Sequence, residues 1–249
     1  MKTKTKQNRK SWFKGLKVFL KIFVRKPKFV YLGDQISTPS IILSNHVGAR
    51  GPVKLELYLD KPFRFWGTYE MNSNIKSIYK YLSNIYFYKK KHMPKFLAKI
   101  VGFVACPFLK LFYSGLNLIS TYPDVRFRKS IKESLKTINS NQNLVIFPED
   151  SSNGYHDTLL SFYSGFVFFA DICLKQGKDL PIYVMYFKRK ENTFIVDKPI
   201  MYSELANMKL DKKDVAKMLC DKANSLSSVD VEKNKKWKKI SFTFFNYYN

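Results

Sequence analysis

Acidic residues are scarce in this sequence. Its 249 residues include 44 lysines and arginines but only 19 aspartates and glutamates, which gives a formal net charge of +25. A chain with this balance attracts polyanions, and the two suppliers that fit are nucleic-acid phosphates and the headgroups of an anionic membrane. Part of the excess accompanies a general abundance of Lys, Asn, Ile, Phe and Tyr, so charge alone does not choose between the two.

Cysteine and histidine are also rare, with three of each in the chain. Cys106, Cys173 and Cys220 are odd in number and widely spaced, and two of them lie in apolar runs. This pattern is typical neither of a disulfide framework nor of a zinc site, and it favours a reducing compartment. We expect no metal centre and no bound cofactor.

The sequence has no uncharged apolar run long enough to cross a membrane. Its most apolar stretch, Phe96–Phe112, is interrupted by two lysines, and the uncharged part, Ile100–Leu109, is about half of the roughly 20 residues that a span requires. We expect a helix, kinked at Pro107, that is buried or dips into the membrane interface. The N-terminus likewise lacks the uninterrupted apolar core of a signal peptide.

A cationic, amphipathic pattern lies near the N-terminus. Basic residues recur every three or four positions and so fall on one stripe of a helix, opposite apolar and aromatic side chains: Lys10, Lys14, Lys17, Lys21 and Arg25. This pattern is typical of a helix lying in the membrane interface, although a surface helix packed on its own domain is the alternative. We predict that residues 1–28 hold the protein peripherally on the cytoplasmic face of a membrane, against anionic lipids. The predicted contact residues are Trp12, Phe13, Lys14, Lys17, Phe19 and Lys21.

Strand and helix patterns alternate after residue 28, without an internal repeat or a low-complexity linker. The 45% hydrophobic content excludes a disordered chain. We predict a single α/β domain over residues 29–249, with a central, mostly parallel or mixed sheet flanked by helices. The predicted strands cover residues 29–33, 41–43, 62–67, 115–119, 143–147, 181–187 and 193–196. The predicted helices cover residues 53–59, 72–86, 96–112, 126–138, 159–174 and 211–225.

Two of the predicted strands end in polar residues. Ile41–Leu43 leads into Ser44-Asn45-His46 and a glycine-containing turn, and the strand at 143–147 leads into Pro148-Glu149-Asp150. The ends of buried strands are where α/β folds place chemistry. His46 is a candidate general base, because the ordinary histidine pKa near 6.5 suits proton transfer at neutral pH. A histidine with a purely structural role is the alternative.

Four short blocks then follow one another in a recognisable order. They are Asn45-His46, Gly115–Ile119, Phe147-Pro148-Glu149 with Phe162 and Gly165 after it, and Leu180–Ile182. In this order they resemble the PlsC-like glycerolipid acyltransferases, the lysophospholipid or 1-acylglycerol-3-phosphate acyltransferase family. Each block alone is weak, whereas four in order, each at a predicted strand or turn, are specific. The resemblance covers roughly residues 29–200.

The resemblance implies an O-acyltransferase that uses acyl-CoA or an acyl-carrier protein as donor and requires no metal. His46 would take the proton from a hydroxyl of a lysophospholipid-type acceptor, and backbone N–H groups of the turn Gly48–Gly51 would stabilise the tetrahedral oxyanion. Glu149 and its neighbours would shape the acceptor site. The predicted substrate-binding residues are Asn45, Arg50, Gly51, Phe147, Pro148, Ser151, Ser152 and Arg126.

One departure from the family pattern concerns the histidine. The family's aspartate, five residues after the histidine, falls on Gly51. A carboxylate of this kind normally holds the imidazole in the correct tautomer. Asp150 stands where the family has glycine, so we hypothesise that it orients His46 from the other side, with Glu149 and Glu56 as weaker candidates.

A second departure concerns the acceptor. The two arginines thought to grip the acceptor phosphate in the family fall on Thr121 and Ser152. Arg50, Arg126 or Arg128 would restore the grip if the fold brings them to the site, because bidentate recognition depends on geometry and not on chain position. Otherwise the acceptor is a lysophospholipid with a headgroup, a glycolipid or another alcohol.

Two other functions compete with an enzyme. One is a catalytically degenerate family member that binds membranes, with Gly51 as the lost residue. The other is a nucleic-acid-binding protein, supported by charge and interleaved aromatics. The N-terminal basic stripe argues against nucleic-acid binding, because the large apolar face opposite is needed by a bilayer and not by RNA.

The adjacent pair His156-Asp157 is predicted to be solvated and not catalytic.

Overall fold

The protein folds around an eight-stranded mixed sheet in the order β1-β7-β6-β2-β5-β3-β4, with β8 paired to β6. This is a computed structural model that describes residues 9–152 and 154–230. Strands β6, β2, β5, β3 and β4 run parallel, while β7 runs antiparallel to β6, so the predicted α/β fold is confirmed. The strands are β1 (Lys28–Tyr31), β2 (Ile41–Ser44), β3 (Phe63–Thr68), β4 (Ile119–Thr121), β5 (Asn143–Ile146), β6 (Pro181–Lys188), β7 (Thr193–Val196) and β8 (Ile200–Met201).

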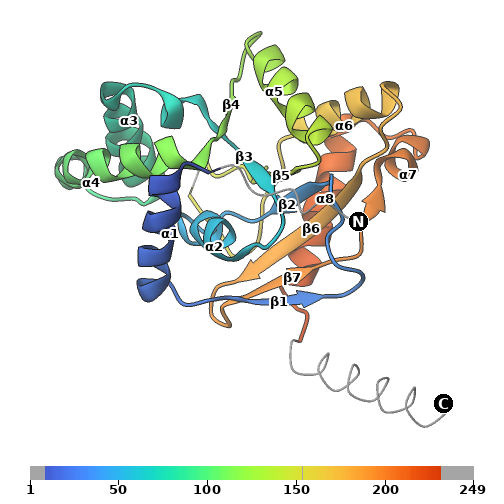
Figure 1. Ribbon diagram of the computed structural model, residues 1–249, viewed down its shortest axis with the longest axis horizontal. Coiled ribbons are helices and arrows are strands. Elements are labelled where there is room, and N and C mark those ends of the chain that lie inside the picture. Colours follow the sequence, from blue (N-terminus) through green and yellow to red (C-terminus); the bar gives the residue numbers. More distant parts are fainter. Residues whose placement is uncertain (1–8, 153, 231–249) are drawn as a thin grey trace.

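Helices cover both faces of the sheet and bury one hydrophobic cluster on each (Figure 1). One cluster gathers residues of α5, α6 and α8, and the other gathers residues of α1, α2 and the end of α4. The helices are α1 (Ser11–Phe23), α2 (Arg50–Tyr58), α3 (Ile75–Tyr81), α4 (Lys95–Leu116), α5 (Phe127–Asn139), α6 (Gly165–Lys175), α7 (Tyr202–Asn207) and α8 (Lys212–Leu226), with the 3-10 turn η1 (Tyr69–Asn72) and the π-helix η2 (Leu82–Lys90).

The centre of the sheet brings the two polar strand ends together. Strand β2 is buried throughout, as its run of branched aliphatic residues predicts, and it pairs in parallel with β5 and β6. Leu43 lies opposite Ile146 in that register. Because the carboxyl ends of parallel strands meet at one edge, the residues after Ser44 and after Ile146 lie side by side there.

A cluster of helices, α3, η2 and α4, is inserted between β3 and β4. The strand predicted at 115–119 was wrong at its start, because Gly115 and Leu116 form the last turn of α4 and only Ile119–Thr121 is strand. Asn117 ends the helix with a positive φ of 52°. Gly115 is required there, since a Cβ would overlap the ring of Phe13.

The helix predicted at 159–174 was also too long at its start. It begins at Gly165, and the preceding segment is extended. Phe162 forms an antiparallel bridge with Glu149, and the N–H of Tyr163 donates to the carbonyl of Pro148 (2.8 Å). This segment therefore braces the chain that follows β5.

The N-terminal helix α1 is packed firmly on the domain. The ring of Phe13 is fully buried against α4, 5.5 Å from the ring of Phe112, so its predicted membrane contact was wrong. Arg9 and Lys17 both pair with the buried carboxylate of Glu56 in α2, at 2.8 and 2.9 Å. The other predicted contact residues, Trp12, Lys14, Phe19 and Lys21, are exposed.

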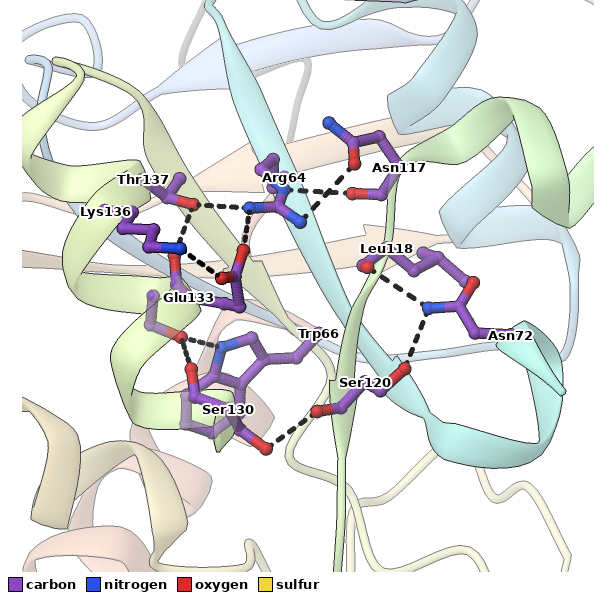
Figure 2. Close-up of polar contacts among 11 residues, drawn as sticks. Arg64, Trp66, Asn72, Asn117, Leu118, Ser120, Ser130, Glu133, Lys136 and Thr137 are labelled. Atoms are coloured by element: carbon purple, nitrogen blue, oxygen red, sulfur yellow. Dashed lines mark hydrogen bonds and ion pairs between the residues drawn. The ribbon is translucent and has the colours of Figure 1, made fainter. Parts of the chain in front are cut away.

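A polar network joins the far end of the sheet to α5 (Figure 2). The guanidinium of Arg64 in β3 donates to the carbonyl of Asn117 (3.0 Å) and to the hydroxyl of Thr137 (3.2 Å). Trp66 Nε1 donates to Ser134 Oγ (2.8 Å). These bonds fix β3, the start of β4 and α5 as one unit beside the inserted helices.

Candidate active site

Asn45 locks the end of β2 to its neighbour β6. Its side-chain Nδ2 donates to the carbonyl of Phe187 (3.3 Å), and its Oδ1 accepts from the N–H of Phe187 (2.6 Å). Asn45 is buried. Both polar groups of Asn45, a predicted substrate-binding residue, are thus bonded to the backbone of β6. These bonds fix the position of the backbone at the next residue, His46.

The turn after His46 has an unusual backbone. Val47 and Gly48 both have positive φ angles, 46° and 63°. A β-branched residue with positive φ is a rare, strained conformation that must be held by its surroundings. The turn points the carbonyl of Gly48 at Nδ1 of the His46 ring, and the two form a hydrogen bond. Because a carbonyl only accepts, Nδ1 carries the proton and Nε2 carries the free lone pair.

The His46 ring lies between two aromatic rings. Its centroid is 4.9 Å from that of Phe147 and 5.1 Å from that of Tyr155, and the ring of Tyr155 is stacked on it. Burial lowers the pKa of His46 to about 4; the bond to Gly48 opposes that shift, and the charges of Lys90 and Lys91 add to it. The imidazole is therefore neutral at neutral pH, the state in which a general base can accept a proton.

Glu149 holds the backbone of His46 and not its ring. Its buried carboxylate accepts the N–H of His46 (2.9 Å). Burial raises the pKa of Glu149, while the bond from His46 and the nearby charge of Lys90 lower it. This contact ties the end of β5 to the end of β2, so Glu149 is a positioning residue for the histidine.

Asp150, which the sequence suggested as the orienting carboxylate, faces another way. It accepts the N–H of Ser152 (3.0 Å) and the hydroxyl of Tyr163 (2.8 Å). The bond from the Ser152 N–H is the main reason that the pKa of Asp150 lies below its usual range. Among the described residues, the partner of the His46 ring nitrogen Nδ1 is the carbonyl of Gly48, so Asp150 does not orient the imidazole in this structure.

The packing around Gly51 leaves no room for a side chain at this position. A Cβ on Gly51 would lie 2.8 Å from the carbonyl oxygen of His46 and 3.2 Å from that of Asn45. The first turn of α2 thus packs directly on the backbone of the turn that contains His46. Arg50, the first residue of that helix, is exposed.

Two lysines that sequence reasoning did not assign to the site lie beside it. Lys90 Nζ donates to Ser151 Oγ (2.7 Å) and lies 5.7 Å from the ring centroid of Tyr155. Lys91 Nζ lies 5.4 Å from the same ring. The three consecutive lysines at 89–91 were visible in the sequence, but they lie at the end of η2 and just after it, and no sequence pattern placed that helix beside His46.

Of the arginines considered for the acceptor phosphate, Arg126 has partners of its own. The guanidinium of Arg126, at the start of α5, is paired with Asp124 (2.7 Å) and lies over the rings of Tyr69 and Tyr122. Glu56 is paired with Arg9 and Lys17, as described above, so it is not available to orient His46.

Residues 9–152 and 154–230 contain no group of three or more His, Cys, Asp or Glu side chains that could hold a metal ion.

No family model and no curated protein matches this sequence. Among solved structures, the chain is similar to the crystal structure of the 1-acyl-sn-glycerophosphate (LPA) acyltransferase PlsC from Thermotoga maritima, with a TM-score of 0.45 and 12% sequence identity. The match covers 88% of this chain and 90% of that chain. This is a likeness of fold, so the function proposed below rests on the residues and contacts of this chain.

Proposed function

We propose that this protein transfers an acyl group from a thioester donor, acyl-CoA or acyl-carrier protein, to the hydroxyl of a lysophospholipid-type acceptor at a membrane surface. One observation carries the proposal. His46 stands at the end of a central strand with its ring neutral and its Nδ1 bonded to the carbonyl of Gly48. That arrangement leaves Nε2 as the proton acceptor, the role of a general base.

The reaction is a simple acyl exchange. Nε2 of His46 takes the proton of the acceptor hydroxyl as its oxygen attacks the thioester carbonyl carbon, forming a C–O bond. The tetrahedral intermediate then collapses, the C–S bond breaks, and the leaving thiolate takes the proton from the imidazolium. A positioned histidine contributes roughly 10²–10⁴-fold to such a step.

The start of α2 is suited to stabilise the oxyanion of the intermediate. The helix begins at Arg50, directly after the turn that follows His46, and its N-cap residue, Ala49, supplies no side-chain hydrogen bond to it. The N-terminus of a helix carries partial positive charge, and its N–H groups favour an anion. This supports the sequence-based expectation that donors come from the turn Gly48–Gly51.

Lys90 and Lys91 favour an acceptor with an anionic headgroup. Their ammonium groups lie against Tyr155, which is stacked on His46, so the two charges stand one ring away from the reacting hydroxyl. Arg126 has its charge matched by Asp124 instead. We therefore assign the grip on the acceptor phosphate to the two lysines.

The membrane contact belongs to the same proposal. Trp12 and Phe19 of α1 are exposed together with Lys14 and Lys21. An apolar face flanked by cations is suited to an anionic bilayer, and it supports peripheral attachment on the cytoplasmic face.

The test is acyl transfer by the purified full chain on anionic vesicles. Labelled acyl-CoA and acyl-carrier protein are each offered with a panel of lysolipids. We expect transfer by the wild type and its loss, by at least about 100-fold, in His46→Ala. The matched control is His156→Ala, because His156 is exposed and outside the ring stack.

Equal activity in the wild type and His46→Ala would contradict the general-base role. No transfer by folded, vesicle-bound protein to any acceptor would favour the catalytically degenerate alternative. Preferential binding to RNA over anionic vesicles at matched salt would favour the nucleic-acid alternative.

A further inference from the structure

Helix α4 exposes a continuous apolar face. The helix is 22 residues long, and it is the one helix in the described part of the chain that is long and apolar enough to cross a membrane by length and composition. The ring of Phe103 is 75% exposed and that of Phe108 is 71% exposed, values far from those of a core helix. The exposed side chains recur at helical spacing and so share one face: Phe96, Leu97, Ile100, Phe103, Val104, Phe108 and Leu111.

The opposite face of α4 is fixed to the domain. Ala98, Gly102 and Cys106 are buried at four-residue spacing. A Cβ on Gly102 would lie 3.4 Å from the backbone of Ser83 in η2, and Cys106 Sγ is 3.4 Å from the carbonyl of Ile75 in α3. Small residues let the helices approach closely, so this face of α4 is committed to η2 and α3.

The surroundings of this face are cationic. No Asp or Glu lies between Glu70 and Asp124, a stretch that contains eight lysines and all of α3, η2 and α4. Likewise none precedes Asp34, so α1 also lacks acidic residues. A single-sign surface of this kind is unusual on a soluble domain, where both signs are normally mixed.

Helices α1 and α4 are in contact. The fully buried ring of Phe13 joins them, packed on Phe112 and Gly115. Figure 1 shows α1, α3 and α4 grouped at one side of the sheet, away from α5, α6 and α7. Helix α1 adds its own exposed apolar side chains to those of α4: Trp12, Val18, Phe19, Ile22 and Phe23.

We propose that α4 is the principal membrane-docking element of this protein. It lies in the plane of an anionic bilayer, with the exposed apolar face that contains Phe103 and Phe108 inserted and with α1 beside it. A bilayer with anionic headgroups matches both the apolar face and the acid-free surroundings. A second copy of the chain would bring like charge to the same surface. A membrane span would require the Ala98, Gly102 and Cys106 face to leave the domain.

This placement has a consequence for the candidate active site. The loop from His92 to Pro94 connects η2, which ends at Lys90, directly to the start of α4. An in-plane α4 would therefore hold Lys90 and Lys91 at headgroup level, where an anionic lysolipid presents its phosphate. Only this role of Lys90 and Lys91 rests on the proposed function. Membrane docking by α4 does not, because vesicle binding requires no catalysis.

The first experiment measures partition of the full chain onto vesicles with and without anionic lipid. We expect the double variant Phe103→Ser with Phe108→Ser to bind anionic vesicles roughly 10-fold or more weakly. The matched control is Val125→Ser with Leu160→Ser, which removes two exposed apolar side chains outside α1 and α4 and should bind like the wild type. His46→Ala should also bind normally, so failure of docking and failure of catalysis are read separately.

The second experiment measures depth. Spin labels at Phe96→Cys, Phe103→Cys and Leu111→Cys are placed along the exposed face, while the three native cysteines are buried. An in-plane helix puts all three labels at one depth, whereas a span spreads them by roughly 1.5 Å per residue along the bilayer normal. Graded label depths, or unchanged vesicle binding by the Phe103→Ser with Phe108→Ser variant, would overturn the proposal. It would also be overturned if this double variant lost self-association and kept its vesicle binding.

Discussion

The two strand ends that meet at His46 are held in different ways. After β2, the chain uses its backbone, because positive φ angles at Val47 and Gly48 bring a carbonyl to the imidazole. After β5, the chain uses carboxylates, since Glu149 accepts the N–H of His46 and Asp150 accepts from Ser152 and Tyr163. The difference shows that the ring is oriented by the main chain, while the carboxylates fix the loops around it.

A carbonyl fixes the tautomer of a histidine as well as a carboxylate does. A carbonyl lacks, however, the full negative charge with which a carboxylate stabilises the imidazolium formed during proton transfer. Together with burial, this is consistent with the low pKa of His46, about 4. If His46 is the general base that we propose, we expect a chemical step that is slower than in a histidine–carboxylate pair.

The largest predicted effect comes from forcing a side chain between the first turn of α2 and the backbone that follows β2. Gly51→Asp introduces the aspartate of the PlsC-like motif, yet we expect it to lower activity by about 100-fold and stability by about 1–3 kcal/mol, because the new Cβ would meet the carbonyl of His46. Gly51→Ala should act in the same direction. Gly15→Ala is the control, since nothing lies within 4 Å of a Cβ there.

Urea unfolding and acyl-transfer rates on vesicles measure both effects. An active, stable Gly51→Asp variant would mean that the turn has room for a carboxylate and that the backbone arrangement is dispensable.

The next effect comes from removing the carboxylate that holds the His46 backbone. Glu149→Leu leaves the buried N–H of His46 without its partner and should cost about 1–3 kcal/mol of stability. Glu149→Gln keeps an acceptor oxygen and should recover most of that stability. Denaturant unfolding of the pair tests this, and equal losses in both variants would show that charge, not the hydrogen bond, matters.

A smaller and more selective effect is expected from the lysines. Lys90→Gln and Lys91→Gln should raise the KM for a phosphate-bearing lysolipid by roughly 10-fold and change the KM for an uncharged acceptor much less. Lys89→Gln is the matched control, because its side chain is exposed at the end of the same π-helix. Equal effects on both acceptors would remove the assigned phosphate grip.

The smallest effect is predicted for Asp150. Asp150→Asn should change kcat by less than about threefold, because its contacts are to Ser152 and Tyr163 and not to the imidazole. The rate is compared directly with that of His46→Ala. A loss of comparable size would restore the idea that Asp150 orients the ring during the reaction.

Sequence patterns were sufficient for the parts of this molecule that depend on periodicity. The buried run Ile41–Leu43 and the polar residues after it gave the central strand and the position of His46. The pattern failed at Gly115, whose place in α4 depends on a distant ring, Phe13. It also failed at Leu159–Ser164, where pairing with the end of β5 overrides an apolar helical pattern.

The candidate site shows the same division. Histidine and glutamate at strand ends were predictable, because parallel strands bring their ends together. The Gly48 carbonyl was not, since a main-chain acceptor leaves no residue type to recognise. Tyr155 and Lys91 were not predictable either. Tyr155 stacks on His46 from the loop before α6, and Lys91, just after η2, lies over the ring of Tyr155.

The most direct test of this account is the tautomer and pKa of His46 in the ¹⁵N NMR spectrum of histidine-labelled protein. The chain has only three histidines, and His46→Gln assigns the signal. We predict a neutral ring at pH 7 with the proton on Nδ1, and titration near pH 4. A proton on Nε2, or a pKa at or above the ordinary value of 6.5, would contradict the claim that the Gly48 carbonyl prepares His46 as the base.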